Sequence, residues 1–265
     1  MTAPLWSVFT KPWPDLDGGR LGLLVAGLGF TGVEIPVRDG FFLTPANAGS
    51  KLPRFVRELA DAGVAPASVA SGLEEATFSA CAAAGVPLIR VMAEVHGGRY
   101  AGSAASFRQQ LEQAAGLAAQ YGVAVGVQPH HGDYVSSAVG VMALLDGLPE
   151  KSFGVIWDAA HDALTGCEPH MTLGLVKDRL AMVNLKNVLY RRRGGSAPVA
   201  EWETVYVAGG SGLARWDRVL AELAALDLAV PVCLSAQYSH SSQPVEDLAA
   251  ADLLLARTLW EATSR

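Results

Sequence analysis

The sequence predicts an α/β protein built as a closed (β/α)8 barrel, the TIM barrel, and three observations support this. Short β-branched or apolar runs alternate with alanine- and leucine-rich segments of helical period along all 265 residues. Eight strand-then-helix units follow one another without a long linker or low-complexity tract, as in a single TIM barrel. Several strands also end in a polar residue, where barrel enzymes place their chemistry. We expect residues 1–265 to form one domain.

The predicted strands are short and rich in valine, isoleucine and leucine. They cover residues 6–9, 32–35, 67–70, 88–92, 123–128, 154–158, 182–186 and 232–237. The predicted helices cover residues 51–62, 73–84, 104–121, 135–145, 215–226 and 245–262. Gly63, Gly85 and Gly122 each follow a helix, which is typical of the left-handed residue that ends a helix before the next strand.

The pattern within the strands favours a closed barrel over an open doubly wound sheet, which the same alternation permits. In 123–128 the valines share one face, suited to packing on helices, whereas Gly126 and Gln128 point the other way. Small residues below and a polar residue at the end suit a narrow barrel interior. The strands that end at Asp158, Lys186 and Gln237 follow the same scheme.

Composition restricts the class of partner. The net charge of −6 supplies few clustered cations for phosphate backbones, so we expect small molecules rather than nucleic acid. Cys81, Cys167 and Cys233 are odd in number and far apart, which indicates a reducing compartment and a cytoplasmic location. No signal peptide is recognisable, and the apolar segment 21–30 is too short and glycine-broken to span a membrane.

The segment from Gly27 to Gly32 matches the dinucleotide fingerprint GxGxxG. That fingerprint must follow a strand and open a helix, whereas this segment ends a helix and enters a strand. We therefore expect a turn here, and neither a nicotinamide nor a flavin cofactor.

Polar residues at the predicted strand ends form the candidate site. The inward-pointing members are Glu34, Gln128, His130, Asp158, Asn184 and Gln237. Because the carboxyl ends of barrel strands meet at one mouth, we expect these side chains to converge.

Two of these strand ends carry the most specific local signals. Asp158 closes a strand and His161 follows one turn later, which could provide a metal ligand and a partner for a substrate hydroxyl. Alternatively, Asp158 caps the next segment and His161 lies in a solvated loop. Gln128, His130 and His131 form the second signal.

Five segments together resemble a known family. They are GVEIP at 32–36, GVQPHHG at 126–132, GVIWDAAH at 154–161, VNLKN at 183–187 and CLSAQY at 233–238. In this order they resemble the xylose isomerase-like TIM barrels, which include sugar phosphate isomerases and epimerases, and the resemblance covers essentially the whole chain. It implies an isomerase or epimerase that acts on a small keto-sugar, polyol or sugar phosphate by proton transfer.

The resemblance also implies one divalent cation, Mn, Mg, Co or Zn, held by glutamate, aspartate, histidine and glutamate. The corresponding positions here are Gln128, Asp158, Asn184 and Gln237, of which only Asp158 keeps its type. Amide oxygens bring no negative charge, so we expect this metal site to be weak or vacant. Glutamine also cannot carry protons, which excludes a mechanism with two glutamates.

Other side chains could perform the chemistry. We expect His130 and His161 to titrate near neutrality and carry protons, with Glu34 and Lys186 assisting. The remaining predicted residues bind substrate: Arg38, Arg90, Gln128, His131, Asn184 and Gln237. Two structural alternatives stay open, because Glu34 could pair with Arg38 or Arg90, and Lys186 could pair with Asp158.

Several further alternatives stay open. The chain could be a non-catalytic sugar-binding protein or partner subunit derived from such an enzyme, or a related lyase or hydrolase. The connection 188–212 is long enough for a lid or a subunit contact, so a homo-oligomer is also open. Within it, Gly209 to Gly212 could bind a phosphate or form a simple turn, and Arg191 to Arg193 could add charge or lie in solvent.

Overall fold

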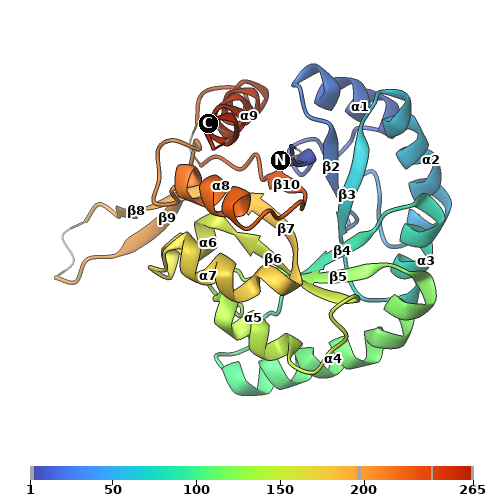
Figure 1. Cartoon of the computed structure of the whole chain (residues 1–265), viewed down its shortest axis with the longest axis horizontal. Coiled ribbons are helices and arrows are strands. Elements are labelled where there is room, and N and C mark those ends of the chain that lie inside the picture. The colour runs from blue at the N-terminus through green and yellow to red at the C-terminus, as the bar shows by residue number, and fades with distance from the viewer. Residues whose placement is uncertain (1–2, 196–197, 240, 264–265) are drawn as a thin grey trace.

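A closed ring of eight parallel strands forms the centre of the computed structural model, which describes residues 3–195, 198–239 and 241–263 (Figure 1). The strands are β1 (Trp6–Phe9), β2 (Gly32–Pro36), β3 (Ala65–Ala70), β4 (Leu88–Val91), β5 (Ala124–Val127), β6 (Phe153–Asp158), β7 (Leu180–Leu185) and β10 (Val232–Leu234). Because β1 pairs in parallel with both β2 and β10, the ring closes. The predicted TIM barrel is therefore confirmed, and the open sheet is wrong.

Helices surround the barrel and cover the outer faces of the strands (Figure 1). They are α1 (Gly18–Gly27), α2 (Ala48–Asp61), α3 (Glu75–Ala84), α4 (Tyr100–Tyr121), α5 (Ala138–Leu145), α6 (Ala159–Leu164), α7 (Pro169–Val176), the 3-10 helix η1 (Lys177–Arg179), α8 (Trp216–Ala225) and α9 (Val245–Ala262). Gly85 and Gly122 end α3 and α4 with φ of 71° and 64°, as their sequence positions predict. Within the described ranges, no helix has the length and apolarity to cross a membrane.

The barrel interior has its own small core beneath the carboxyl ends of the strands. It consists of the buried residues Ala67, Leu88, Ile156, Met182 and Cys233. A Cβ atom on Gly126 would lie 2.6 Å from the side chain of Ile156, so only glycine fits beside that isoleucine. The predicted placement of small residues inside the barrel is confirmed at this position.

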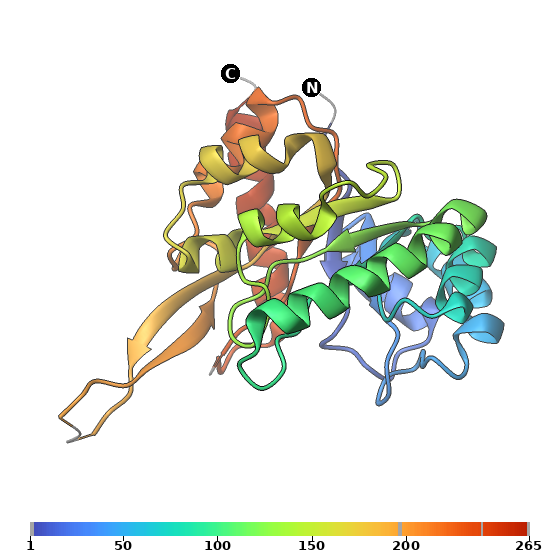
Figure 2. The same ribbon diagram turned by 90° about the horizontal axis from the view of Figure 1, so that it is seen from below.

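The largest departure from the sequence prediction is an antiparallel hairpin. Strands β8 (Asn187–Arg192) and β9 (Trp202–Val207) pair with each other and follow β7 almost directly. Figures 1 and 2 show the hairpin projecting away from the barrel. The sequence analysis treated this segment only as a long connection. The last barrel strand is also shorter than predicted, because β10 ends at Leu234 and leaves Gln237 in the following loop.

The GxGxxG segment lies where a turn is required. Helix α1 ends at Gly27, Gly29 has a φ of 92°, and β2 begins at Gly32. The segment therefore connects a helix to a strand, opposite to the order that dinucleotide binding needs.

Candidate active site

A cavity of about 90 Å³, which we call the inner cavity, opens at the carboxyl ends of the barrel strands. The predicted site residues that line it are Glu34, Arg38, Arg90, Gln128, His130, Asn184, Lys186 and Gln237. Phe9, Lys11, Met92 and Ser235 also line it. The structure therefore brings together side chains from strand ends that are far apart in the sequence.

Arg90 is held from two sides at the base of the inner cavity. Its Nε donates to Oε1 of Glu34 at 2.6 Å, and its Nη1 donates to Oε1 of Gln128 at 2.5 Å. Ser68 Oγ donates to the same oxygen of Glu34 at 3.0 Å. Of the two pairings left open for Glu34, the structure contains the one with Arg90. Glu34 thus fixes the position of the guanidinium group.

Asp158 lies just below the inner cavity and is fully buried. Its Oδ1 accepts the backbone N–H groups of Ala160 and His161 at 3.0 and 3.1 Å, so Asp158 is the N-cap of α6. Its Oδ2 accepts a hydrogen bond from Nε2 of Gln128 at 2.7 Å and lies 3.7 Å from Nζ of Lys186. The capping alternative is therefore correct, and both carboxylate oxygens are engaged.

The charge of Asp158 depends on its neighbours. Burial raises the pKa of its carboxyl, but positive charge at His161 and Lys186 and the N–H group of His161 outweigh burial, so the net pKa is lowered. Because His161 is neutral near pH 7, the Lys186 ammonium and the N–H groups provide this stabilisation there. We infer that Asp158 is ionised at neutral pH.

Lys186 connects Asp158 to the histidines. Its Nζ lies 2.8 Å from Nε2 of His161 and 4.8 Å from the centre of the Tyr206 ring. Burial lowers the pKa of Lys186, and the charge of Asp158 opposes that effect. The pairing of Lys186 with Asp158, which was the structural alternative for this lysine, is present.

His130, His131 and His161 pack against one another. The ring centres of His130 and His161 are 4.1 Å apart, and those of His131 and His161 are 5.2 Å apart. Burial, aided by the charge of Lys186, lowers the pKa of His130 to about 4, lowers that of His131, and lowers that of His161 to about 2. The expectation that these rings titrate near neutrality is therefore wrong, because burial disfavours their charged forms. The expectation of a solvated loop at His161 is also wrong.

The hydrogen bond of His130 fixes its tautomer. Nδ1 of His130 lies 2.7 Å from the carbonyl oxygen of His131. A carbonyl oxygen only accepts, so Nδ1 carries the proton and Nε2 carries the lone pair. His130, which lines the inner cavity, therefore keeps an unprotonated Nε2.

The four positions that correspond to the implied metal ligands do not fit a divalent cation. Both oxygens of Asp158 are engaged, the ammonium of Lys186 is 3.7 Å away, and Gln128, Asn184 and Gln237 contribute no negative charge. Oδ1 of Asn184 is buried and has no hydrogen-bond partner within the described residues, so it can accept a ligand hydroxyl. The positive charge of the site comes from side chains such as Arg90 and Lys186.

A different set of residues could hold a metal. Ligand atoms of His130, His131 and His161 all lie within 4.8 Å of one another. Neutral imidazoles suit ions such as zinc or copper. Such an ion would compete with Lys186 Nζ for Nε2 of His161, and with Thr204, whose Oγ1 is 3.1 Å from Nε2 of His131.

The hairpin contributes residues that sequence reasoning missed. Thr204 and Tyr206, both on β9, contact His131, and the Tyr206 ring also lies beneath Lys186. The segment WETVYV at 202–207 is rich in aromatic and β-branched residues, so the sequence did contain a strand signal here.

The glycine loop at 209–212 is a structural turn. The N–H of Gly209 donates to Asp252 at 2.7 Å, and Asp252 also accepts the Tyr238 hydroxyl at 2.9 Å. A carboxylate at this loop occupies the donor that a phosphate would need. Arg191 and Glu203 pair on the hairpin at 2.6 Å, where the Arg191 side chain is exposed and that of Glu203 is partly buried.

Comparison with known proteins places the chain in a family. A family model described as xylose isomerase-like TIM barrel matches residues 23–259. A 3-keto-D-glucoside 4-epimerase from E. coli has a TM-score of 0.72 at 15% identity, covering 97% of this chain and 100% of the other. A D-psicose 3-epimerase from Clostridium cellulolyticum H10 has a TM-score of 0.72 at 12% identity, covering 96% and 99%.

A xylose isomerase domain protein from Planctomyces limnophilus has a TM-score of 0.72 at 15% identity and covers 99% of each chain. At these identities the solved structures show a shared fold. The search of curated proteins gave no match. The family model, which spans nearly the whole chain, shows that this protein belongs to the xylose isomerase-like TIM barrel family.

Proposed function

We propose that this protein is an isomerase of the sugar isomerase and epimerase class, which moves a proton beside the carbonyl group of a small keto-sugar or sugar phosphate. The observation that carries the proposal is that His130, whose Nε2 is unprotonated, and Lys186 line the same cavity. His130 Nε2 supplies the base, and Lys186 supplies the positive charge. No divalent cation is needed for either role.

The proton transfer can be written with these two groups. His130 Nε2 takes a proton from the carbon next to the carbonyl, and the C–H electron pair moves to form an enediolate whose oxygen carries the charge. Lys186 and Arg90 stabilise that negative charge. The proton then returns to the neighbouring carbon, while a hydroxyl proton moves to the former carbonyl oxygen. A base with a pKa of about 4 is unprotonated at neutral pH, as a glutamate base would be.

The lining of the inner cavity supports a hydroxylated substrate that becomes negatively charged during the reaction, as the enediolate does. Lys11, Arg38, Arg90 and Lys186 line it together with the carboxylate of Glu34. Arg38 has no carboxylate within ion-pair distance among residues 3–195, 198–239 and 241–263, so its charge is available to a ligand. Oδ1 of Asn184, which no group in the described part of the chain hydrogen-bonds, can accept a substrate hydroxyl.

A non-catalytic sugar-binding protein is the second candidate. It is favoured by Asp158, whose oxygens are all engaged, and by the amides at Gln128, Asn184 and Gln237, which bind hydroxyls without transferring protons. The two candidates differ in whether a bound ketose exchanges carbon-bound hydrogen with solvent.

Solvent deuterium incorporation tests the proposal whatever product is formed. The protein is incubated in D2O with a panel of ketoses, aldoses and their phosphates, and NMR follows the C–H signals beside the carbonyl. We expect exchange with at least one compound, and His130→Gln should lower its rate by about 100-fold because the base is lost. His170→Gln, a matched change at an exposed histidine on α7, should leave the rate unchanged.

Thermal unfolding must show that both histidine variants remain folded. Equal exchange rates in His130→Gln and the unchanged protein would exclude His130 as the base. Binding of a ketose without any exchange would favour the sugar-binding candidate.

A further inference from the structure

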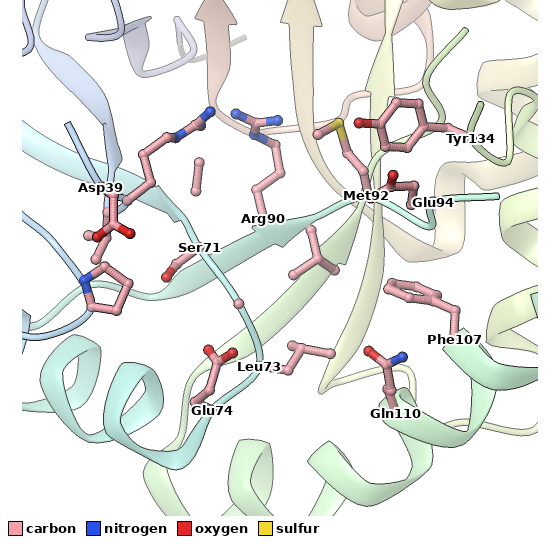
Figure 3. Close-up of a pocket in the computed structure, with 16 residues that line it drawn as sticks. Asp39, Ser71, Leu73, Glu74, Arg90, Met92, Glu94, Phe107, Gln110 and Tyr134 are labelled. Atoms are coloured by element: carbon pink, nitrogen blue, oxygen red, sulfur yellow. The ribbon is translucent and has the colours of Figure 1, made fainter. Parts of the chain in front are cut away.

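A second and larger cavity lies beside the inner cavity, and its volume is about 560 Å³. We call it the outer cavity. It lies over β3 and β4 and is lined by the segments that follow β2, β3 and β4, by α4, and by Tyr134 (Figure 3). Arg38, Arg90 and Met92 line both cavities, so the two spaces share one wall.

The two volumes differ in what they can hold. Pockets for small molecules typically have volumes of about 300–1,000 Å³. The outer cavity falls within this range, whereas the inner cavity, at about 90 Å³, falls well below it. A ligand that reaches Lys186 and His130 therefore fills the inner cavity with only its reacting end. The rest of that ligand must lie toward the outer cavity.

The outer cavity offers unused polar groups for that remaining part. The side chains of Ser71, Gln110 and Tyr134 make no hydrogen bond to another group in the described portion of the chain. In the view of Figure 3, Glu74 and Gln110 lie across the cavity from Arg90. Hydroxyl, amide and carboxylate groups with free donors and acceptors suit a ligand with many hydroxyls.

The outer cavity also has an apolar side and an acidic side. Leu73, Met92 and Phe107 provide apolar surface on which a sugar ring can pack. Asp39, Glu74 and Glu94 provide three carboxylates against the guanidinium groups of Arg38 and Arg90, and Arg90 is already paired with Glu34. The lining therefore carries an excess of negative charge, which would repel a second anionic group. This combination favours an uncharged sugar ring over a phosphate or a sugar acid.

Tyr134 connects the two cavities. It lines the outer cavity, and its ring packs edge-on against His130, which lines the inner cavity, with ring centres 4.8 Å apart. A ligand seated against Tyr134 would therefore lie close to the proposed base.

We propose that the outer cavity binds a second, uncharged sugar ring, so that the preferred ligand is a disaccharide whose reducing end enters the inner cavity. This inference rests on the proposed function for the identity of the reacting end. It adds a binding site on the loops after β3 and β4 and on α4, and it defines the size of the substrate.

Calorimetric binding tests this inference. The probes are D-fructose and three disaccharides that end in fructose and differ in linkage or in the second sugar: maltulose, lactulose and isomaltulose. We expect at least one disaccharide to bind about tenfold more tightly than D-fructose, because only it can use the outer cavity. Gln110→Trp should weaken the binding of that disaccharide by about tenfold, because the indole fills the outer cavity. The affinity for D-fructose should stay within about twofold of its value in the unchanged protein.

Gln113→Trp is the matched control. Gln113 is exposed on the same helix, α4, and does not line the outer cavity. The inference is overturned if D-fructose binds as tightly as every disaccharide, if none of the probes binds, or if the two tryptophan variants behave alike. Calorimetry does not need turnover, so failure of the deuterium exchange leaves this result readable. Conversely, exchange on D-fructose without a preference for disaccharides would refute only the outer site.

Discussion

Gln128 explains why this site carries amides where the family resemblance implies carboxylates. Its Oε1 accepts from Arg90 at 2.5 Å, and its Nε2 donates to Asp158 at 2.7 Å. A glutamate at this position could still accept from Arg90, but it would place a second carboxylate beside Asp158 without a proton between them. The amide therefore links the Glu34–Arg90 pair to the Asp158–Lys186 pair. The positive charge of the site comes from the side chains of Arg90 and Lys186.

Asp162 makes the stability of the protein depend on pH. It is buried, it accepts the Thr172 hydroxyl at 2.9 Å, and burial raises the pKa of its carboxyl from 3.8 to about 6. Between these two pH values the folded state binds more protons than the unfolded state, so the contribution of Asp162 to the free energy of unfolding falls as pH rises from about 4 to about 6.

Asp162→Asn should remove that loss, because the amide oxygen can still accept from Thr172 and carries no charge. Above pH 6 we expect the free energy of unfolding of the variant to exceed that of the unchanged protein by roughly 3 kcal/mol, and below pH 4 we expect this difference to disappear. Urea unfolding at pH 4, 5, 6 and 7 measures this, and Asp61→Asn, at an exposed aspartate of α2, is the control. A difference that does not change with pH would show that Asp162 does not titrate in this range.

At the level of residues, the sequence predicted where the site residues lie better than it predicted their protonation states. Alternation along the strands was sufficient to bring Glu34 and Asn184 to one cavity, whereas Gln128 and Gln237 reach it from beyond the ends of β5 and β10. It could not show that His161 is fully buried, because that depends on neighbours from several strands and on the hairpin. The protonation of the histidines follows from burial, which a linear pattern does not reveal.

Among the elements, the β8–β9 hairpin has the clearest effect on the site. It leaves the barrel immediately after β7 and places Thr204 and Tyr206 against His131 and Lys186. Figure 2 shows the hairpin projecting away from the barrel, and its residues Thr204 and Tyr206 contact His131. The hairpin was not predicted from the sequence because a helix was expected after each strand, and an antiparallel pair breaks that repeat.

Tyr206 should position Lys186 through its ring. Tyr206→Leu removes the aromatic face beneath the ammonium group, so we expect deuterium exchange to slow by about fivefold. Tyr206→Phe keeps the face and loses only the hydroxyl, so its rate should stay within about twofold of the unchanged protein. The comparison separates the two roles of the side chain. Equal slowing in both variants would instead assign the effect to the hydroxyl, which lies 3.4 Å from Nδ1 of His131.

At the scale of the whole molecule, the repeat of strand and helix was the feature of the sequence that predicted the structure most reliably. Each strand must bury one face against helices and the other inside the barrel, and this requirement repeats from β1 to β10. The ends of elements were less predictable, as with Gln237, which lies beyond β10, because the point where a strand stops pairing depends on its neighbours.

Ring closure also predicts how the protein unfolds. Ile156 is fully buried inside the barrel, in contact with residues from other strands. We expect Ile156→Ala to lower the free energy of unfolding by about 3 kcal/mol. Because every strand depends on two neighbours, the whole barrel should still unfold in one transition. Leu254→Ala, at a leucine of α9 that is 68% exposed, should change stability by less than about 0.5 kcal/mol.

Urea unfolding, followed by far-ultraviolet circular dichroism and by tryptophan fluorescence, measures this cooperativity. The fluorescence sums six tryptophans, among which Trp6 on β1 and Trp157 on β6 lie on strands that are not neighbours in the ring. In Ile156→Ala both signals should shift to the same lower urea concentration, since a cavity inside a closed ring weakens all of its strands together. Separate transitions for the two signals would mean that parts of the barrel unfold independently, and an unchanged midpoint would mean that the interior cluster does not support the ring.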